Sequence, residues 1–162
     1  MTGGSAVRGA AGPEAGSKLI PMVVLGGWLG AGKTTLLNRL LRAAGDGERI
    51  AVVVNDVGEV CLDAELVAAR DGDTVELTNG CVCCSIGDSL GVTLRDLVLS
   101  DRPPDRLVIE ASGVAEPDRV AAYGDRRRLR LDGVVVAVDA LDVVDRAGHV
   151  TYGPLGRRQA EA

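Results

Sequence analysis

Aromatic residues are scarce in this chain of 162 residues, which has no Phe, one Trp and two Tyr. Domains that bind single-stranded nucleic acid stack the bases on several aromatic rings, and this chain has too few for that mode. A formal net charge of -5 also argues against electrostatic binding of DNA. We therefore expect no nucleic-acid partner and a core built from Val, Leu, Ile and Ala.

Long apolar runs are also missing. The uncharged stretch Leu19–Gly32 is 14 residues long, contains Pro21 and four Gly, and leads directly into Lys33. It is too short to span a bilayer, and its glycines do not fit a signal-peptide core. We expect no membrane partner and a cytoplasmic location. Lysine is equally rare, because Lys18 and Lys33 are the only two among 18 basic residues.

The chain has four Cys residues, but their spacing does not suit disulfides. Cys81, Cys83 and Cys84 fall within four residues, and Cys61 stands apart. Bridges between such close neighbours would be strained. Reduced thiols in a cytosol are the better interpretation.

The hydrophobic pattern predicts an α/β fold with a mainly parallel sheet. Residues 1–17 have no periodicity and are predicted to form a disordered tail. Strands are expected at Leu19–Leu25, Ile50–Val54, Thr74–Thr78, Leu107–Glu110 and Val134–Val138. Helices are expected at Gly32–Ala44, Asp63–Ala69, Ile86–Ser100 and Pro117–Tyr123, with a further helical stretch at Arg157–Ala162. Runs such as Ile50–Val54 are apolar without alternation, as in strands that helices cover on both faces.

The segment Gly27–Thr34 matches the pattern G-x-x-x-x-G-K-[ST] between a predicted strand and a predicted helix. Glycines let successive N–H groups point at phosphate oxygens, and the helix N-terminus adds positive potential. Lys33 would contact the β- and γ-phosphates, and the Thr34 hydroxyl would bind Mg²⁺. The predicted nucleotide-binding residues here are Gly27, Gly30, Ala31, Gly32, Lys33, Thr34 and Thr35.

A second acid is expected for Mg²⁺, and Glu110 ends the strand Leu107–Glu110. A carboxylate there could hold Mg²⁺ through water, and Gly113 could give an N–H to the γ-phosphate. The alternative is a Glu that simply opens a solvated loop.

Cys81, Cys83 and Cys84 follow Asn79-Gly80 and could converge on one soft cation from a tight turn. They supply three of the four ligands of a tetrahedral Zn²⁺ site, with Cys61 as a distant candidate for the fourth. His149 is better explained as a solvated loop residue. Buried apolar thiols and a redox switch remain the alternatives.

Together these motifs resemble the CobW/HypB/UreG group of P-loop GTPases, and within it the CobW-like metallochaperones. The stretches that carry the resemblance are Leu25–Leu41, Asn55–Glu59 with Asp63–Val67, Leu77–Cys84, Glu110–Pro117 and Leu131–Ala140. The resemblance implies a three-layer P-loop NTPase fold of the SIMIBI type. It also implies GTP with Mg²⁺ as ligands, GTP hydrolysis, and transfer of Zn²⁺ or Co²⁺ to a client metalloprotein.

Residue roles follow from the same resemblance. It implies that Lys33, Asp56, Glu59 and Glu110 serve catalysis, that Thr34 and Glu110 hold Mg²⁺, and that Cys81, Cys83 and Cys84 hold the transferred metal. Two positions depart from the family pattern. Asp56 stands where Glu is common, and Val57 where an aromatic residue is common.

An Asn-Lys-x-Asp motif, which reads guanine in that family, cannot occur because no Lys follows Lys33. We therefore expect residues 18–162 to be an incomplete GTPase domain that lacks the base-recognition strand and a C-terminal domain. A sheet without its last strands would expose the edge at Val134–Val138 and promote dimerisation. A basic run at Arg126–Arg128 and Arg130 could dock a partner, but it is expected to be a solvated helix end. The alternatives are a P-loop ATPase or small-molecule kinase, and a non-catalytic metal-binding domain.

Overall fold

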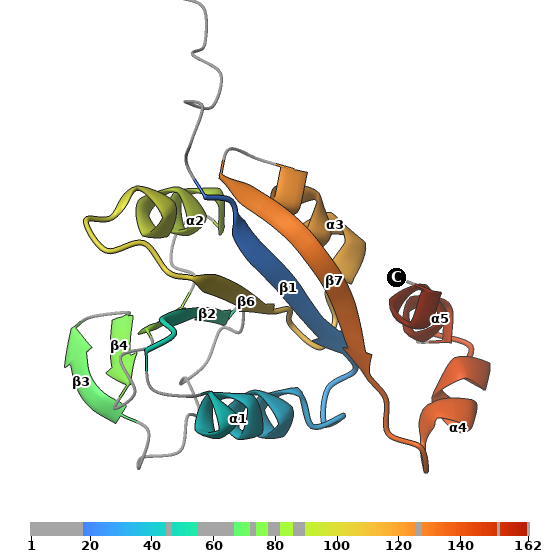
Figure 1. Cartoon of the computed structure of the whole chain (residues 1–162). Helices are drawn as coiled ribbons and strands as arrows, with labels where there is room; N and C mark the ends of the chain where they lie inside the picture. The colour runs from blue at the N-terminus through green and yellow to red at the C-terminus, as the bar shows by residue number, and fades with distance from the viewer. Residues whose placement is uncertain are drawn as a thin grey trace, which may run out of the picture.

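The computed structural model describes residues 18–44, 47–54, 67–71, 74–77, 82–85, 90–125, 128–151 and 153–161. These residues form one seven-stranded sheet with helices around it (Figure 1). The strands are β1 (Ile20–Gly27), β2 (Ile50–Val54), β3 (Val67–Asp71), β4 (Thr74–Leu77), β5 (Val82–Ser85), β6 (Arg106–Glu110) and β7 (Leu129–Ala137). The helices are α1 (Lys33–Ala43), α2 (Leu90–Leu99), α3 (Pro117–Ala121), α4 (Val143–Gly148) and α5 (Gly153–Glu161), with a 3-10 turn η2 (Ala122–Asp125) after α3.

The strand order is β3-β4-β5-β2-β6-β1-β7. From β5 to β7 every neighbouring pair is parallel, whereas β4 is antiparallel to both β3 and β5. Parallel strands that are linked by helices have their carboxyl ends at one edge of the sheet. Here Leu25 of β1 and Val54 of β2 both lie level with Glu110 of β6. The chain turns that follow these strands therefore meet at one edge.

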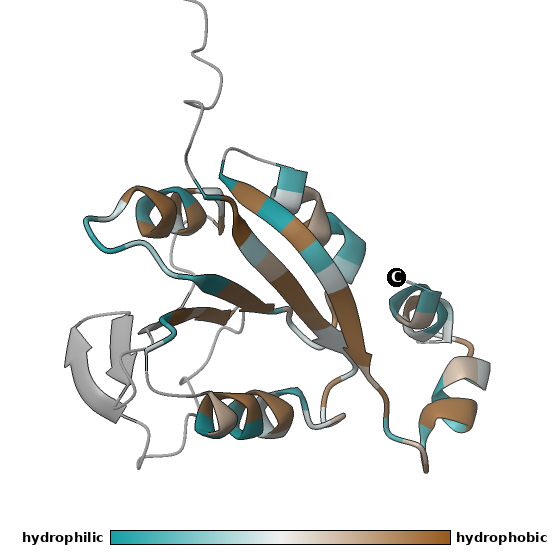
Figure 2. Ribbon diagram, viewed as in Figure 1, coloured by the Kyte–Doolittle hydropathy of each residue, from teal (hydrophilic) through white to brown (hydrophobic). Residues whose placement is uncertain are grey.

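Both faces of the central sheet are buried, which confirms the expected three-layer fold. On one face, Val24, Val53 and Ile109 pack with Leu94 and Val98 of α2 in a core that also includes Val120 of α3. On the other face, Leu25 and Val52 pack against Leu37 and Leu41 of α1. Alternate residues of one strand thus belong to two different cores, which explains why the runs are apolar without alternation. Figure 2 shows apolar colour along the middle of β1, between paler ends.

Two predicted segments are corrected by the structure. The predicted helix Asp63–Ala69 is wrong over its last residues, because Val67–Asp71 is strand β3, paired with β4. The antiparallel pairing of Asp71 with Thr74 fixes this segment as a strand, and it outweighs the short apolar pattern that predicted a helix. The strand near Val134–Val138 begins earlier, at Leu129, because its first half pairs with β1 from Ile20 onward.

Among the described residues, β7 ends the sheet order beside β1, where an edge was expected. Val135 and Val138 are about half exposed there. Dimerisation through this edge stays a prediction. None of the described helices is long and apolar enough to cross a bilayer.

The close approach of β1 and β7 at Gly27 gives a stability prediction. Gly27 has a φ of 127°, and a Cβ there would lie 2.2 Å from the Ala137 carbonyl oxygen. We expect Gly27→Ala to lower the free energy of unfolding by about 3 kcal/mol through overpacking and backbone strain. Urea unfolding followed by circular dichroism would measure it.

Gly133→Ala is the matched control, because Gly133 lies in β7 with open space around its Cβ position. Its unfolding midpoint should stay close to that of the unsubstituted chain. A Gly27→Ala midpoint equal to the control would contradict the predicted steric restriction.

Candidate functional site

The phosphate loop, residues 27–34, connects β1 to α1 and is shaped by three glycines with positive φ. Gly27, Gly30 and Gly32 have φ values of 127°, 82° and 88°, in the left-handed region that other residues rarely adopt. The Ala31 N–H donates to the Trp28 carbonyl at 3.1 Å and closes a turn. Gly32 then caps the 11-residue helix α1. The loop therefore ends at a helix N-terminus, a favourable position for an anion.

Lys33 lies inside this loop with only 6% of its surface exposed. Its Nζ donates to the Gly27 carbonyl oxygen at 3.0 Å and to the Trp28 carbonyl oxygen at 3.3 Å. Burying an ammonium group is unfavourable unless it is hydrogen-bonded, so these two carbonyls hold the charge in place. The cation predicted from the sequence, Lys33, therefore lies inside the curve of the phosphate loop.

Thr34 and Glu110 meet at this edge of the sheet although 76 residues separate them. The Thr34 hydroxyl donates to Oε1 of Glu110 at 2.9 Å, and Glu110 is 6% exposed. A hydroxyl and a carboxylate are oxygen donors of the kind that Mg²⁺ prefers. The two residues predicted from separate motifs as magnesium ligands are therefore in direct contact, and their chemistry fits that cation.

The Glu110 loop, residues 111–116, packs on the phosphate loop. The Ala111 N–H donates to the Leu25 carbonyl at 2.9 Å, and the Ala115 N–H donates to the Ser112 carbonyl at 2.9 Å, closing a turn. A Cβ at Gly113 would lie 2.7 Å from the Leu29 backbone nitrogen. Only glycine lets the two loops approach this closely.

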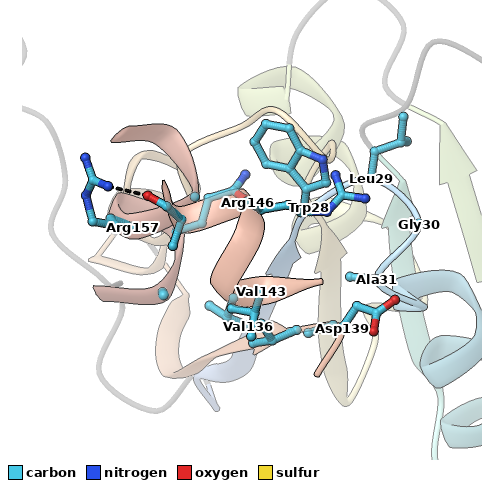
Figure 3. A pocket seen from close by; sticks show the side chains of 15 residues that line it. Trp28, Leu29, Gly30, Ala31, Val136, Asp139, Val143, Arg146 and Arg157 are labelled. Carbon is cyan, nitrogen blue, oxygen red and sulfur yellow. Dashed lines mark hydrogen bonds between the residues drawn. The ribbon is translucent and has the colours of Figure 1, made fainter. Parts of the chain in front are cut away.

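Helices α4 and α5 form one wall of a pocket of about 100 Å³ whose other side is the phosphate loop (Figure 3). The Arg146 guanidinium of α4 lies 5.5 Å from the centre of the Trp28 ring, a cation–π contact. From α5, Gln159 donates to the carbonyl oxygens of Gly113 at 3.1 Å and Ala115 at 2.8 Å. Both loops of the site are thus contacted by this helix pair.

Sequence reasoning missed Trp28, Arg146 and Gln159 as parts of the site. The partners of Gln159 are main-chain carbonyls more than 40 residues away, so no side-chain spacing reveals them. A weak signal existed in Trp28, the only tryptophan of the chain, which stands inside the phosphate-loop motif.

Cysteine placement differs from the expectation. Cys83 and Cys84 lie in strand β5, between β2 and β4, and not on a tight turn. Pairing on both sides of β5 determines this local structure in spite of the preceding Asn79-Gly80. Cys81, Cys61, Asp56 and Glu59 lie outside the described residues, as do Arg126 and Arg127.

Within the described part of the chain, no group of three or more His, Cys, Asp or Glu side chains could hold a metal ion. His149 is an exposed residue between α4 and α5, where its Nδ1 accepts from the Thr151 N–H at 3.2 Å. Its position agrees with the expected loop residue.

Comparison with known proteins identifies similar chains. Residues 21–161 match the family model of the CobW/HypB/UreG nucleotide-binding domain. The chain is 38% identical over 134 residues to the zinc chaperone CobW of Sinorhizobium sp, covering 76% of this chain and 38% of that protein. It is also 38% identical over 141 residues to the zinc chaperone YjiA of Escherichia coli, covering 82% of this chain and 44% of that protein. The chain thus spans less than half the length of these relatives.

Solved structures agree. The zinc-bound crystal structure of the Escherichia coli YjiA GTPase matches with a TM-score of 0.61 and 36% identity, over 84% of this chain and 45% of that one. A zinc-bound triple mutant of the YjiA GTPase, in which one Glu and two Cys are replaced by Ala, matches with the same TM-score and 33% identity.

The contact between Gly113 and Leu29 predicts a cost for any side chain at position 113. We expect Gly113→Ala to destabilise the chain by about 2 kcal/mol, since the neighbouring atoms are backbone and cannot move aside easily. The melting temperature measured by calorimetry should fall by roughly 4–8 °C.

Gly148→Ala serves as its control, because open space surrounds that Cβ position at the end of α4. Its melting temperature should remain that of the unsubstituted chain. A Gly113→Ala protein that melts with the control would show that the two loops are not packed as described.

Proposed function

Because the chain belongs to the CobW/HypB/UreG family of nucleotide-binding domains, we propose that it binds GTP with Mg²⁺, hydrolyses it, and couples this cycle to transfer of a metal ion to a client metalloprotein. The cargo is Zn²⁺ or Co²⁺. The single observation that carries the nucleotide part is the Thr34–Glu110 contact beside the buried Lys33. We further propose a cytoplasmic location, because the cysteines must stay reduced to bind metal.

In this proposal the phosphate loop holds the triphosphate. Its neutral N–H groups would donate hydrogen bonds to the phosphates, and the α1 N-terminus would add a partial positive charge. Lys33 would supply a full positive charge. Lys33 would exchange its loop carbonyls for phosphate oxygens, so its charge stays compensated in both states. The residues assigned to the nucleotide are Gly27, Gly30, Ala31, Gly32, Lys33, Thr34, Thr35 and Gly113.

Thr34 and Glu110 would hold Mg²⁺, which supplies charge neutralisation at the β- and γ-phosphates when bound. Asp56 and Glu59 would orient the attacking water from the segment that follows β2. Lys33 would stabilise the negative charge that develops on the transferred phosphoryl group.

Cys81, Cys83 and Cys84 would bind the cargo metal as thiolates. The sheet supports a link between this segment and the nucleotide. Ser85 of β5 is level with Val54 of β2, which is level with Glu110 of β6. Neighbouring strands are about 4.8 Å apart, so the backbone after Cys84 lies about 10 Å from that of Glu110.

Nucleotide binding would change the conformation of the segment after β2 and thereby alter the thiolate site. Coupling of this kind requires that the metal-gripping and metal-releasing states differ in their affinity for nucleotide. The proposed site has three protein ligands, so it should exchange its metal more readily than a closed four-cysteine site.

The two lysines provide a sharp test of nucleotide binding. Lys33→Met keeps an apolar side chain of similar length but removes the buried cation, so affinity for a fluorescent GTP analogue should fall roughly 30- to 150-fold, or about 2–3 kcal/mol. Lys18→Met removes the other lysine, whose side chain is 80% exposed, and should bind like the unsubstituted chain. Fluorescence titration would measure all three affinities.

Equal affinities for the two lysine variants would overturn the phosphate-loop assignment. Competition by unlabelled GTP and ATP in the same titration separates the rival functions. Preference for ATP would favour a kinase or ATPase, and turnover at the buffer background with metal still bound would favour a non-catalytic metal-binding domain.

Metal binding is tested by replacing Cys81, Cys83 and Cys84 with Ser together. The Co²⁺ thiolate charge-transfer band should disappear, while GTP affinity should change less than threefold because the cluster is separate from the phosphate loop. Metal uptake should release protons and weaken as pH falls, since only thiolates bind. The band is the measurement of choice because it reports sulfur ligation directly.

Cys61→Ser is the control variant and should retain the band if Cys61 is not a ligand. A full-intensity band in the triple variant would place the metal elsewhere. Absence of metal binding by the reduced, unsubstituted chain would instead favour a redox or packing role for these cysteines.

A further inference from the structure

We propose that Gln159 of α5 is a positioning residue that holds the Glu110 loop against the phosphate loop, so that α5 responds to the presence of the terminal phosphate. The inference rests on the proposed GTPase function and deepens it. It assigns a role to a helix that no sequence motif connected to the site.

The Gln159 side chain is 2% exposed and is the only polar side chain of α5 that is buried among the described residues. Its amide nitrogen has two protons, and it donates to the carbonyl oxygens of Gly113 at 3.1 Å and Ala115 at 2.8 Å. The number of donors therefore equals the number of acceptors. A buried donor that loses its acceptors is unfavourable, so this match fixes both carbonyls relative to the helix.

The two carbonyls belong to the turn that determines where Gly113 lies. Ala115 also bonds back to Ser112 through its N–H, and Gly113 rests on the backbone of Leu29. Gln159 thus restrains the turn from the side of α5 while the phosphate loop restrains it from the other side. A shift of Gly113 toward a phosphate would change the geometry of both Gln159 hydrogen bonds.

Helix α5 is itself connected back to the phosphate loop. Arg157 donates to the Ala147 carbonyl of α4, drawn as the dashed line in Figure 3. Gly153 approaches the same carbonyl so closely that a Cβ would lie 2.5 Å from it. Arg146 of α4 then stacks on Trp28.

These contacts close a ring. It runs from Trp28 through α4 and α5 to Gln159, then through Gly113 to Leu29, which is covalently bonded to Trp28. Because the ring contains both loops, movement of either loop must be accommodated by α4 and α5. This is the physical basis for coupling between the phosphate end of the site and the helix pair.

Two variants of Gln159 separate donor chemistry from packing. Gln159→Met keeps the length and approximate volume of the side chain but has no N–H. Gln159→Glu keeps the shape but replaces the NH₂ group by a carboxylate oxygen, so an acceptor would face the two carbonyl acceptors. The matched control is Arg158→Met in the same helix, which breaks a solvent-accessible ion pair with Glu116, the last residue of the Glu110 loop, at 2.9 Å. Glu116 keeps its second ion pair, with Arg119 at 2.6 Å. Exposed pairs contribute little, so the control should behave like the unsubstituted chain.

The first measurement needs no nucleotide. Hydrogen exchange of the Ala115 amide, followed by NMR on the 162-residue chain, reports opening of the turn directly. We expect exchange at least tenfold faster in both Gln159 variants and unchanged exchange in Arg158→Met. Unchanged exchange in the Gln159 variants would overturn the proposal.

The second measurement separates positioning from general support. Single-turnover GTP hydrolysis should slow at least tenfold in the Gln159 variants, while the Kd for GDP stays within twofold, because GDP has no terminal phosphate. Equal losses of GTP and GDP affinity at an unchanged hydrolysis rate would show a purely structural helix and overturn the proposal. If the unsubstituted chain binds no GTP but Gln159→Met still accelerates exchange, the GTPase function fails, and with it the response to phosphate, whereas the restraint of the turn stands.

Discussion

The buried ammonium of Lys33 is the constraint on which the rest of this site depends. A charge with 6% exposure must be hydrogen-bonded, and the Gly27 and Trp28 carbonyls accept from it. Gly27 itself adopts a φ of 127°, and a Cβ at that position would meet the backbone of Ala137 in β7. A single cation therefore links the shape of the loop, the choice of glycine and the tight pairing of β1 with β7.

The register of the sheet then determines which polar groups lie at the same edge as Lys33. Strands buried on both faces hold β6 between β1 and β2, so Glu110 lies level with the ends of both neighbours. That register brings its carboxylate to the Thr34 hydroxyl at the start of α1. In Figure 1, α1 lies on one side of the sheet and α2 and α3 on the other, which leaves the strand ends as the place where polar groups of several elements meet.

The parts of this arrangement that are local in sequence could be predicted, and the parts that depend on distant pairing could not. The phosphate loop, Glu110 and the apolar strands follow from patterns within a few residues, and the structure places them as expected. The sequence predicts a helix where β3 begins, because the pairing of β3 with its partner β4 is not visible in a short helical pattern. It predicts a turn at Cys83 and Cys84, which lie in β5 because that strand pairs on both sides. Gln159 could not be found, since main-chain carbonyls carry no sequence identity.

The ring of contacts through Trp28, Arg146, Gln159 and Gly113 has a genetic consequence. In a closed ring, the effect of breaking one contact depends on whether the others are intact, so effects on stability and function do not add. Substitutions at Arg146 and Gln159, on different helices, are therefore expected to be epistatic. Among homologues, a replacement at one of these four residues is therefore expected to be accompanied by a compensating replacement at another, so the four positions should covary.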